Sequence, residues 1–381
     1  MKMVAAMEFY YQEVYELYRE LVGISSQSAN KSGVDRVGDK IAEFMRQRDF
    51  CVEKCMNPEA GNGVLISVNP NGHGKRIVLL AHMDTVHKEG TFAEPLFRED
   101  GDKIYGPGVL DCKGGIVAGL LTMLALRDCG YQAPVKFILA PDEEINLSKS
   151  GQKGIDFIKD NVQDADYVMV LESGTRNKLV TGRKGVVRYE VSVHGKAAHA
   201  GCAYDKGISA IREASSKILE LEKNSDSHGI TYNCGLISGG VMPNSVPDFC
   251  KFVVDVRFFN QRQQKEAIDT VERIVETAFF EGTRSEMRLL SKREAMEETE
   301  GNMALFRIIQ TVAKRLQLEE LESFVSGGAS DACFSSAMGI PTVCGMGIIG
   351  QFQHTISEEA DISSIKTRSI LLGKTMEELN V

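Results

Sequence analysis

Five side chains of types that bind metal ions follow or flank apolar segments of this chain. They are His82, Asp111, Glu144, Glu172 and His354. His82 and Asp84 come directly after the apolar run at residues 77–80. A short apolar run predicts a buried strand, and ligands of open α/β sheets bind beyond the carboxyl ends of strands. A His-x-Asp sequence there can supply a metal ligand and the carboxylate that orients it.

Each of the other candidates has an ordinary structural explanation when it is considered alone. Asp111 lies between glycine-rich turns where a helix should begin, so it could be an N-cap. Glu144 could be an exposed loop residue, and His354 could be structural. Taken together, two imidazoles and three carboxylates indicate a site for a pair of divalent ions, with Asp111 as the natural bridge. Mixed nitrogen and oxygen ligands favour two Zn²⁺ ions per subunit, with Co²⁺ or Mn²⁺ as alternatives.

Glu143, the residue beside Glu144, could serve as a proton acceptor. Side chains of adjacent residues diverge, so Glu144 can bind metal while Glu143 handles the proton of a water molecule. Glu143 would act as a general base and then protonate a leaving nitrogen. Asp84 would fix the tautomer of His82. Metal ions at such a site polarise a carbonyl and lower the pKa of bound water, which predicts hydrolysis.

A second group of polar residues lies in the middle of the chain. His199 or Asn244 could donate a hydrogen bond to a tetrahedral oxyanion. Arg257 could bind a substrate carboxylate in a bidentate fork. From the residues alone, however, they are explained better as polar surface residues, with Arg257 paired to Asp255.

The elements that must position the metal ligands alternate between strands and helices. Apolar runs predict strands at residues 63–68, 76–80, 135–140 and 167–171, and helical spacing predicts a helix at 115–129. The first residues, 1–21, read as an amphipathic helix. This alternation predicts an α/β fold with helices on both faces of a sheet.

Near residue 185 the pattern changes to alternating apolar and polar positions. Strands near 187–193, 230–237, 249–258 and 286–290, with helices at 208–221 and 262–280, give the order βαββαβ. After residue 295 the first style returns, with a helix at 303–316, a strand at 341–345 and a helix at 362–379. We therefore predict a domain of residues 1–183 and 296–381 that is interrupted by an α+β, ferredoxin-like domain of residues 184–295.

Composition excludes some classes of protein. The chain has 381 residues, 43% of them hydrophobic, and a formal net charge of −9, which argues against binding a nucleic acid backbone. The nine cysteines lack paired metal-type spacing. We find neither a secretory signal nor an apolar run of about 18 residues. These features predict a cytoplasmic protein without a membrane span.

The motifs resemble those of the M20 metallopeptidase family, and within it the carboxypeptidase G2-like (glutamate carboxypeptidase) group. The resemblance covers nearly the whole chain. The matching segments are His82-Met83-Asp84-Thr85-Val86, Tyr105-Gly106-Pro107-Gly108, Asp111-Cys112-Lys113-Gly114-Gly115, Asp142-Glu143-Glu144, Glu172, Gly195-Lys196-Ala197-Ala198-His199-Ala200-Gly201 and His354. The chain departs from the family pattern at Cys112, Ser173 and Ala329.

The resemblance implies a zinc-exopeptidase-like α/β catalytic domain with an inserted dimerisation domain. One ion would be bound by His82, Asp111 and Glu172, and the other by Asp111, Glu144 and His354. It also implies a homodimer in which His199 reaches the partner subunit's active site. The positions that would contact substrate are Arg257, Asn244 and Lys178.

These observations predict an enzyme that cleaves an amide bond next to a free C-terminal carboxylate, in a small peptide or an N-acyl amino acid. Two alternatives share the metal chemistry, namely an N-acyl amino-acid deacylase and an aminotripeptidase. A third is a metal-dependent binding or scaffold protein without catalysis. Glu143 argues against the third alternative, because binding alone needs no base beside a ligand.

Overall fold

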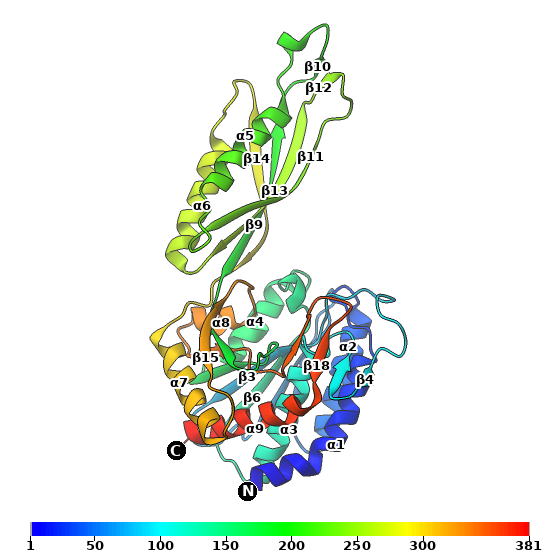
Figure 1. The fold of residues 1–381 in the computed structure, drawn as a ribbon, viewed down its shortest axis with the longest axis vertical. Coiled ribbons are helices and arrows are strands. Elements are labelled where there is room, and N and C mark those ends of the chain that lie inside the picture. Colours follow the sequence, from blue (N-terminus) through cyan, green and yellow to red (C-terminus); the bar gives the residue numbers. More distant parts are fainter. Residues whose placement is uncertain (1, 381) are drawn as a thin grey trace. The chain divides into compact units, whose positions relative to one another are not determined.

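The computed structural model describes residues 2–380. The chain divides into two compact units, labelled by element in Figure 1. Unit 1 consists of Met1–Gly182, Glu298–Val325 and Ser330–Val381, and unit 2 of Arg183–Glu297 and Ser326–Ala329. The sequence predicted boundaries after residues 183 and 295. That the units are a catalytic domain and an inserted dimerisation domain stays a prediction.

An eight-stranded mixed sheet forms the centre of unit 1. Its strand order is β1 (Cys51–Cys55), β2 (Gly63–Val68), β6 (Val135–Ala140), β3 (Ile77–His82), β7 (Tyr167–Val170), β16 (Thr342–Cys344), β8 (Lys178–Arg183) and β15 (Glu322–Ser326). The four strands β6, β3, β7 and β16 are parallel to their neighbours within this group. Every residue of β3 is buried, as expected for a central parallel strand that reads as a continuous apolar run.

Helices pack on this sheet and on one another. They are α1 (Lys2–Val22), α2 (Lys31–Arg46), α3 (Lys113–Asp128), α4 (Gly151–Val162), α7 (Glu300–Arg315), α8 (Ala332–Ala337) and α9 (Ile362–Leu379). Helices α1, α3 and α9 contact one another, and α4 contacts α8. Helix α3 begins two residues before the predicted position, directly after the segment that carries Asp111. Across residues 2–380, none of the helices has both the length and the apolar character of a membrane span.

A second, small sheet in unit 1 was not predicted from the sequence. Its order is β17 (Gly350–Gln351), β18 (Glu359–Asp361), β5 (Lys103–Tyr105) and β4 (Arg98–Asp100). Strands of two or three residues are too short to show an alternating pattern. The antiparallel pairing of β18 with β5 brings the segment after His354 beside the segment before Asp111.

Unit 2 contains a four-stranded antiparallel sheet and two helices. The sheet has the order β11 (Thr231–Gly239), β13 (Phe249–Phe258), β9 (Gly185–His194) and β14 (Arg284–Arg293). Helices α5 (Ala210–Lys223) and α6 (Gln261–Glu276) contact the sheet and each other. The chain order βαββαβ is the predicted one, and the predicted fold class, an α/β fold with an inserted α+β part, is confirmed.

A buried ion pair within α5 contacts the end of α6. The Nζ atom of Lys217 lies 2.9 Å from Oε1 of Glu213, and both side chains are fully buried. Lys217 also donates to the carbonyls of Ile274 and Val275 at the end of α6, each at 3.0 Å. Glu213 accepts from the backbone amides of the segment that follows α6. Lys217 therefore satisfies carbonyls at the end of α6, and Glu213 satisfies amides just beyond it.

Candidate metal centre

Three neighbouring parallel strands end at one edge of the large sheet, and each leads to a candidate ligand. His82 is the last residue of β3, Glu144 follows the end of β6, and Glu172 follows the end of β7. Since parallel strands place their carboxyl ends together, side chains far apart in the sequence meet here. The loop before α3 adds Asp111 to the same edge, and the β17–β18 hairpin adds His354.

The first group of ligand atoms belongs to His82, Asp111, Cys112 and Glu172. These atoms all lie within 4.8 Å of one another, and all four residues are buried. Nε2 of His82 is 3.0 Å from Oδ1 of Asp111 and 4.0 Å from Oε2 of Glu172. The Cys112 thiol donates to the carbonyl of Leu171 at 3.0 Å. The sequence singled out Cys112 only as a departure from a family pattern, because a lone cysteine has no ligand spacing.

The second group consists of Asp111, Glu144 and His354. Nε2 of His354 lies 3.2 Å from Oδ2 of Asp111 and 3.1 Å from Oε2 of Glu144. Asp111 thus turns one oxygen toward His82 and the other toward His354. This is the arrangement that a carboxylate shared by two metal ions requires.

The electrostatics of the cluster fit cations. Burial raises the pKa of Glu144 to about 7, although the hydrogen bond with His354 opposes this shift. Hydrogen bonds to Asp111 and Glu144 raise the pKa of His354 to about 11. Burial alone would raise the pKa of Asp111, but hydrogen bonds from the two histidines hold it well below its usual value. Three carboxylates crowded into a buried site need positive charge nearby, and divalent ions with nitrogen and oxygen ligands would supply it.

Asp84 connects the first ligand to the turn that carries the general-base candidate. Its Oδ1 lies 3.2 Å from Nδ1 of His82. The same carboxylate accepts from the backbone amides of Glu143 at 3.1 Å and Glu144 at 3.2 Å, in the short 3₁₀ turn Glu143–Ile145. Ser28, which the sequence did not single out, donates to Oδ2 at 2.6 Å. Asp84 therefore orients both the imidazole and the turn of the two glutamates.

His199 and Asn244 belong to unit 2, where the short strands β10 (Ala198–His199) and β12 (Ser245–Val246) bring them together. Nδ1 of the exposed His199 accepts from the backbone amides of Gly201 and Cys202, both at 3.1 Å. An accepting Nδ1 carries no proton, so the proton of the neutral ring is on Nε2. His199 can therefore act as a hydrogen-bond donor through Nε2.

Arg257 lies near the other end of the unit 2 sheet. On β13 it pairs with Val186 of β9, whereas Phe249, at the start of β13, pairs with His194. Arg257 donates to Asp255 through Nε at 2.6 Å and Nη2 at 3.1 Å. Arg188 donates to the same carboxylate at 2.6 Å, so two guanidinium groups share one acid. Lys178, at the exposed start of β8, belongs to unit 1.

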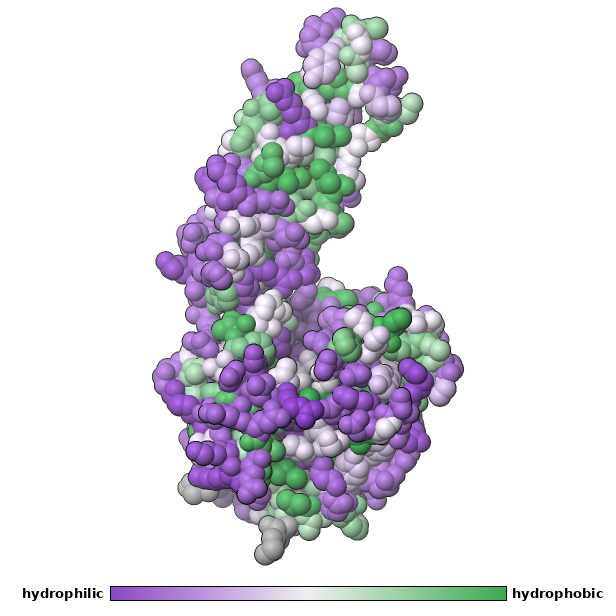
Figure 2. Space-filling view, in the orientation of Figure 1, coloured by the Kyte–Doolittle hydropathy of each residue, from purple (hydrophilic) through white to green (hydrophobic). Residues whose placement is uncertain are grey.

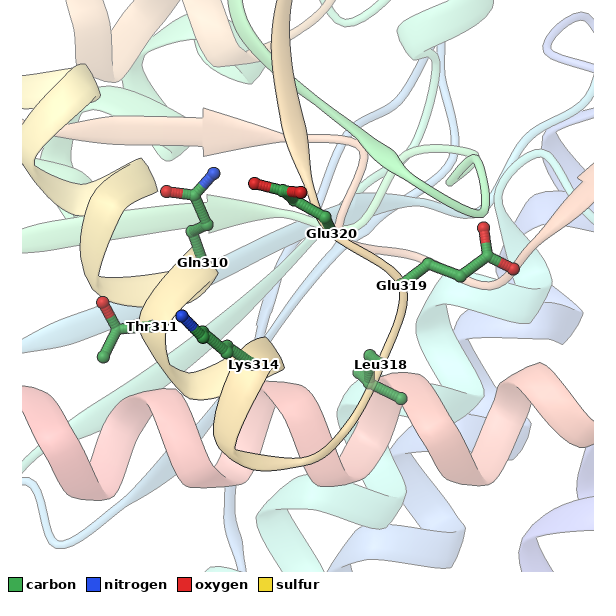
Figure 3. Close-up of a pocket in the computed structure, with 6 residues that line it drawn as sticks. All are labelled: Gln310, Thr311, Lys314, Leu318, Glu319 and Glu320. Atoms are coloured by element: carbon green, nitrogen blue, oxygen red, sulfur yellow. The ribbon is translucent and has the colours of Figure 1, made fainter.

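A surface pocket elsewhere in unit 1 includes none of the candidate ligands. It has a volume of about 380 Å³. In Figure 3 its lining side chains come from α7 and the loop that follows this helix, and they are Gln310, Thr311, Lys314, Leu318, Glu319 and Glu320. Its lining residues lie on α7 and the following loop, and not at the strand ends that carry the candidate ligands.

Comparisons with known proteins identify a family and similar structures. Residues 78–378 match the family described as peptidase family M20/M25/M40. Carboxypeptidase G2 of Pseudomonas sp. (strain RS-16) is 28% identical over 378 residues, which cover 96% of this chain and 89% of that protein. Aminopeptidase PepT from Bacillus cereus has a similar structure, with a TM-score of 0.82 at 20% identity over 97% of this chain and 98% of that one. The YXEP protein of Bacillus subtilis, described as a dinuclear metal binding peptidase, has a TM-score of 0.73 at 16% identity over 98% of this chain and 100% of that one.

Proposed function

Because the chain belongs to peptidase family M20/M25/M40, we propose that it is a zinc-dependent exopeptidase of the glutamate carboxypeptidase type. It would cleave an amide bond next to a free C-terminal carboxylate in a small peptide or an N-acyl amino acid. The observation that carries the proposal is the pair of ligand groups that share Asp111, with Glu143 beside the ligand Glu144.

His82, Asp111 and Glu172 would hold one Zn²⁺ ion, and Asp111, Glu144 and His354 the other. Co²⁺ and Mn²⁺ also accept such ligands. When bound, the two ions polarise the scissile carbonyl and make a water molecule more acidic. Glu143 would take the proton of the attacking water and transfer it to the leaving nitrogen. The hydrogen bond from its backbone amide to Asp84 fixes the turn from which the Glu143 side chain would act.

His199 would stabilise the tetrahedral oxyanion. Its Nε2–H is available because Nδ1 already accepts two backbone amides, and a neutral donor of this kind suits an oxyanion. Asn244 would contribute beside it, since β10 and β12 hold the two residues together. Arg257 lies eight residues along β13 from Phe249, which pairs with His194 near the end of the sheet that leads to His199. Eight residues of a strand span roughly 26 Å, which favours His199 and Arg257 serving different active sites of a dimer.

Arg257 would bind the substrate carboxylate, with Lys178 as a second cation. Asp255 holds Nε and Nη2 of Arg257, which fixes the plane of the guanidinium and leaves its remaining donors for a ligand. Arg188 leaves the three-residue cluster with a net positive charge. A cluster of this charge would attract a carboxylate.

A homodimer through unit 2 is also part of the proposal. Among residues 2–380, β11 pairs only with β13, so its other edge is open. On β11, Leu236 is 68% exposed and Ile237 55%, and Leu219 on α5 is 70% exposed. Figure 2 shows hydrophobic side chains gathered over this part of unit 2. An open edge beside apolar side chains favours pairing with a second copy.

The dimer can be tested by light scattering. Leu236→Asp places a charge on the open edge and should convert the dimer to a monomer. Leu290→Asp on β14, the other edge strand of the same sheet, is the matched control and should leave the mass unchanged. A monomeric wild-type chain would contradict the proposal. Cys51 and Cys202 are exposed thiols, which favours a reducing compartment, and the cytoplasmic location stays a prediction.

The related alternatives are an aminotripeptidase and an N-acyl amino-acid deacylase. The structural similarity to aminopeptidase PepT concerns the fold alone. Substrate preference must therefore distinguish the proposed activity from these alternatives. The experiment is hydrolysis of N-acyl-glutamate, its α-amide, a tripeptide with a free amino terminus and an N-acetyl amino acid. Each is tested after chelation and again after Zn²⁺ is restored. Metal-restored release of glutamate from the free acid but not the amide supports the proposal. Preference for the tripeptide or the N-acetyl amino acid would replace it with the corresponding alternative.

A further inference from the structure

Glu358 is a buried carboxylate that the proposed reaction does not use. It is 1% exposed and lies between His354 and strand β18. Its Oε1 accepts from the backbone amides of Leu110 at 2.9 Å and Asp111 at 3.0 Å. Its Oε2 accepts from the amide of Gly108 at 3.0 Å and lies 3.1 Å from Nε2 of His87. One side chain thus binds three of the four amides at residues 108–111.

The amide and the carbonyl of Val109, between these residues, have partners other than Glu358. The amide of Val109 donates to the carbonyl of Gly106 at 3.3 Å, and the Tyr18 hydroxyl donates to the carbonyl of Val109. Residues 108–111 are buried, so water cannot replace the contacts of Glu358. Without that carboxylate, three buried amides would lose their acceptor. The conformation of this loop therefore depends on Glu358.

The loop ends at Asp111, the one residue that belongs to both ligand groups. Asp111 must present one oxygen to His82 at 3.0 Å and the other to His354 at 3.2 Å. A shift of its backbone would disturb both groups at once.

Glu358 also anchors the segment that carries His354. The His354 side chain is 52% exposed, and the intervening residues 355–357 are exposed, so few other contacts hold this ligand. The amide of Glu358 donates to the carbonyl of Thr355 at 3.2 Å, and the next residue pairs with Tyr105 of β5. Glu358 is therefore a buried residue that contacts both the loop before Asp111 and the segment that follows His354.

We propose that Glu358 is a positioning residue that holds Asp111 and His354 in their positions relative to each other before metal binds. Its side-chain partner is His87. This inference rests on the metal centre of the proposed function. It concerns how the site is built, rather than which substrate it takes.

The test compares metal affinity in full-length variants. Zn²⁺ binding is measured by competition with a chromophoric chelator, and kcat and KM are measured in parallel. Glu358→Gln retains one acceptor oxygen but loses the charge, and should weaken binding of at least one ion by about 10–100-fold. Glu358→Ala should weaken it further. KM should stay near the wild-type value while kcat falls, because no proposed substrate contact is altered.

A matched control is available in unit 2. Glu213 is also fully buried and accepts from two backbone amides, those of Phe279 at 3.1 Å and Phe280 at 2.9 Å. Glu213→Gln should lower the thermal midpoint and leave Zn²⁺ affinity unchanged. If it weakens Zn²⁺ binding as much as Glu358→Gln does, the effect is a general one of losing a buried carboxylate, and the inference fails.

A measurement on the unmutated chain covers the case in which Glu358→Gln does not fold. In metal-free wild type, the amides of Gly108, Leu110 and Asp111 should remain protected from hydrogen exchange. Exchange at the rate of exposed amides would overturn the inference. If the wild type binds two ions and the Glu358→Gln variant binds them with equal affinity, only this inference is overturned. Wild type that binds no ion would overturn the proposed function and the inference with it.

Discussion

The carboxylate of Asp84 accepts a hydrogen bond from the backbone amide of Glu143 at 3.1 Å. The same oxygen, Oδ1, lies 3.2 Å from Nδ1 of His82. One buried oxygen atom therefore holds His82, a proposed metal ligand, and the backbone of Glu143, the proposed general base, which are 61 residues apart in the sequence. Asp84 thus connects His82 to the turn that carries Glu143, whereas the sequence predicted only that it would orient His82.

Asp84→Asn should impair metal binding and catalysis together. The amide side chain removes the negative charge and turns one acceptor into a donor that faces either the imidazole or a backbone amide. We expect a loss of about 10–100-fold in metal affinity or activity. Chelator competition and steady-state kinetics would measure it. Ser28→Ala removes a neutral donor to the same carboxylate and should have a smaller effect; equal effects would contradict a special role for Asp84.

Glu143→Gln should separate catalysis from metal binding. The variant keeps the backbone amide that Asp84 binds, but its side chain can no longer accept a proton. Turnover should fall by about 10²–10⁴-fold while both ions are retained. Metal analysis of the purified variant and initial rates on the best substrate would test this. The neighbouring substitution Glu144→Gln should instead weaken metal binding, and normal turnover in Glu143→Gln would rule out the assigned role.

Arg257→Ala should raise KM for substrates with a free C-terminal carboxylate and lower kcat/KM. Loss of a charge-assisted pair is expected to cost about 1.5–3 kcal/mol, or roughly 10–150-fold. The α-amide of the same substrate, which lacks the carboxylate, should be affected much less. Kinetics on this matched pair of substrates would decide, and equal losses on both would indicate that Arg257 acts through the fold of β13.

Lys217→Met should destabilise the protein strongly. It leaves the carboxylate of Glu213 buried without its cation and removes the donor to the end of α6. Breaking a buried pair in this way costs about 3–5 kcal/mol. Lys265→Met is the control, because Lys265 and Asp269 form a pair of the same spacing at 3.0 Å with side chains 81% and 58% exposed. It should change the free energy of unfolding by about 0.5 kcal/mol or less in urea titrations.

The pH dependence of stability should report the Asp255 cluster. Burial alone would raise the pKa of Asp255, but hydrogen bonds from Arg257 and Arg188 lower it below the usual 3.8. A carboxyl with a lower pKa in the folded state stabilises the protein above its unfolded pKa, and this contribution disappears as pH falls through the folded pKa. The destabilisation caused by Asp255→Asn should therefore be constant above about pH 5 and shrink below about pH 4. Urea unfolding of both proteins from pH 3 to 6 would test this, and a difference that does not shrink in acid would contradict it.

Much of the large sheet could be predicted because its central strands are buried on both faces. Such strands read as continuous apolar runs, as the predicted runs at β2, β3 and β6 do. The exposed strand β1 and the edge strand β15 have no such pattern and were missed. Helix α6 ends at Glu276, four residues before the predicted end. The helix end there is set by its contacts with α5, which the sequence pattern does not report.

The sequence by itself determined which residue types stand after each strand, and therefore the ligand candidates and the proposed chemistry. Those features follow from short-range periodicity, which depends only on neighbouring residues. Only the tertiary structure decided that Asp111 turns one oxygen to each histidine, that Cys112 joins the first group and that Glu358 binds the loop before Asp111. These contacts join residues that are far apart in the chain. They depend on strand order and on the pairing of β5 with β18. Packing of the whole unit determines both, and no local sequence pattern encodes them.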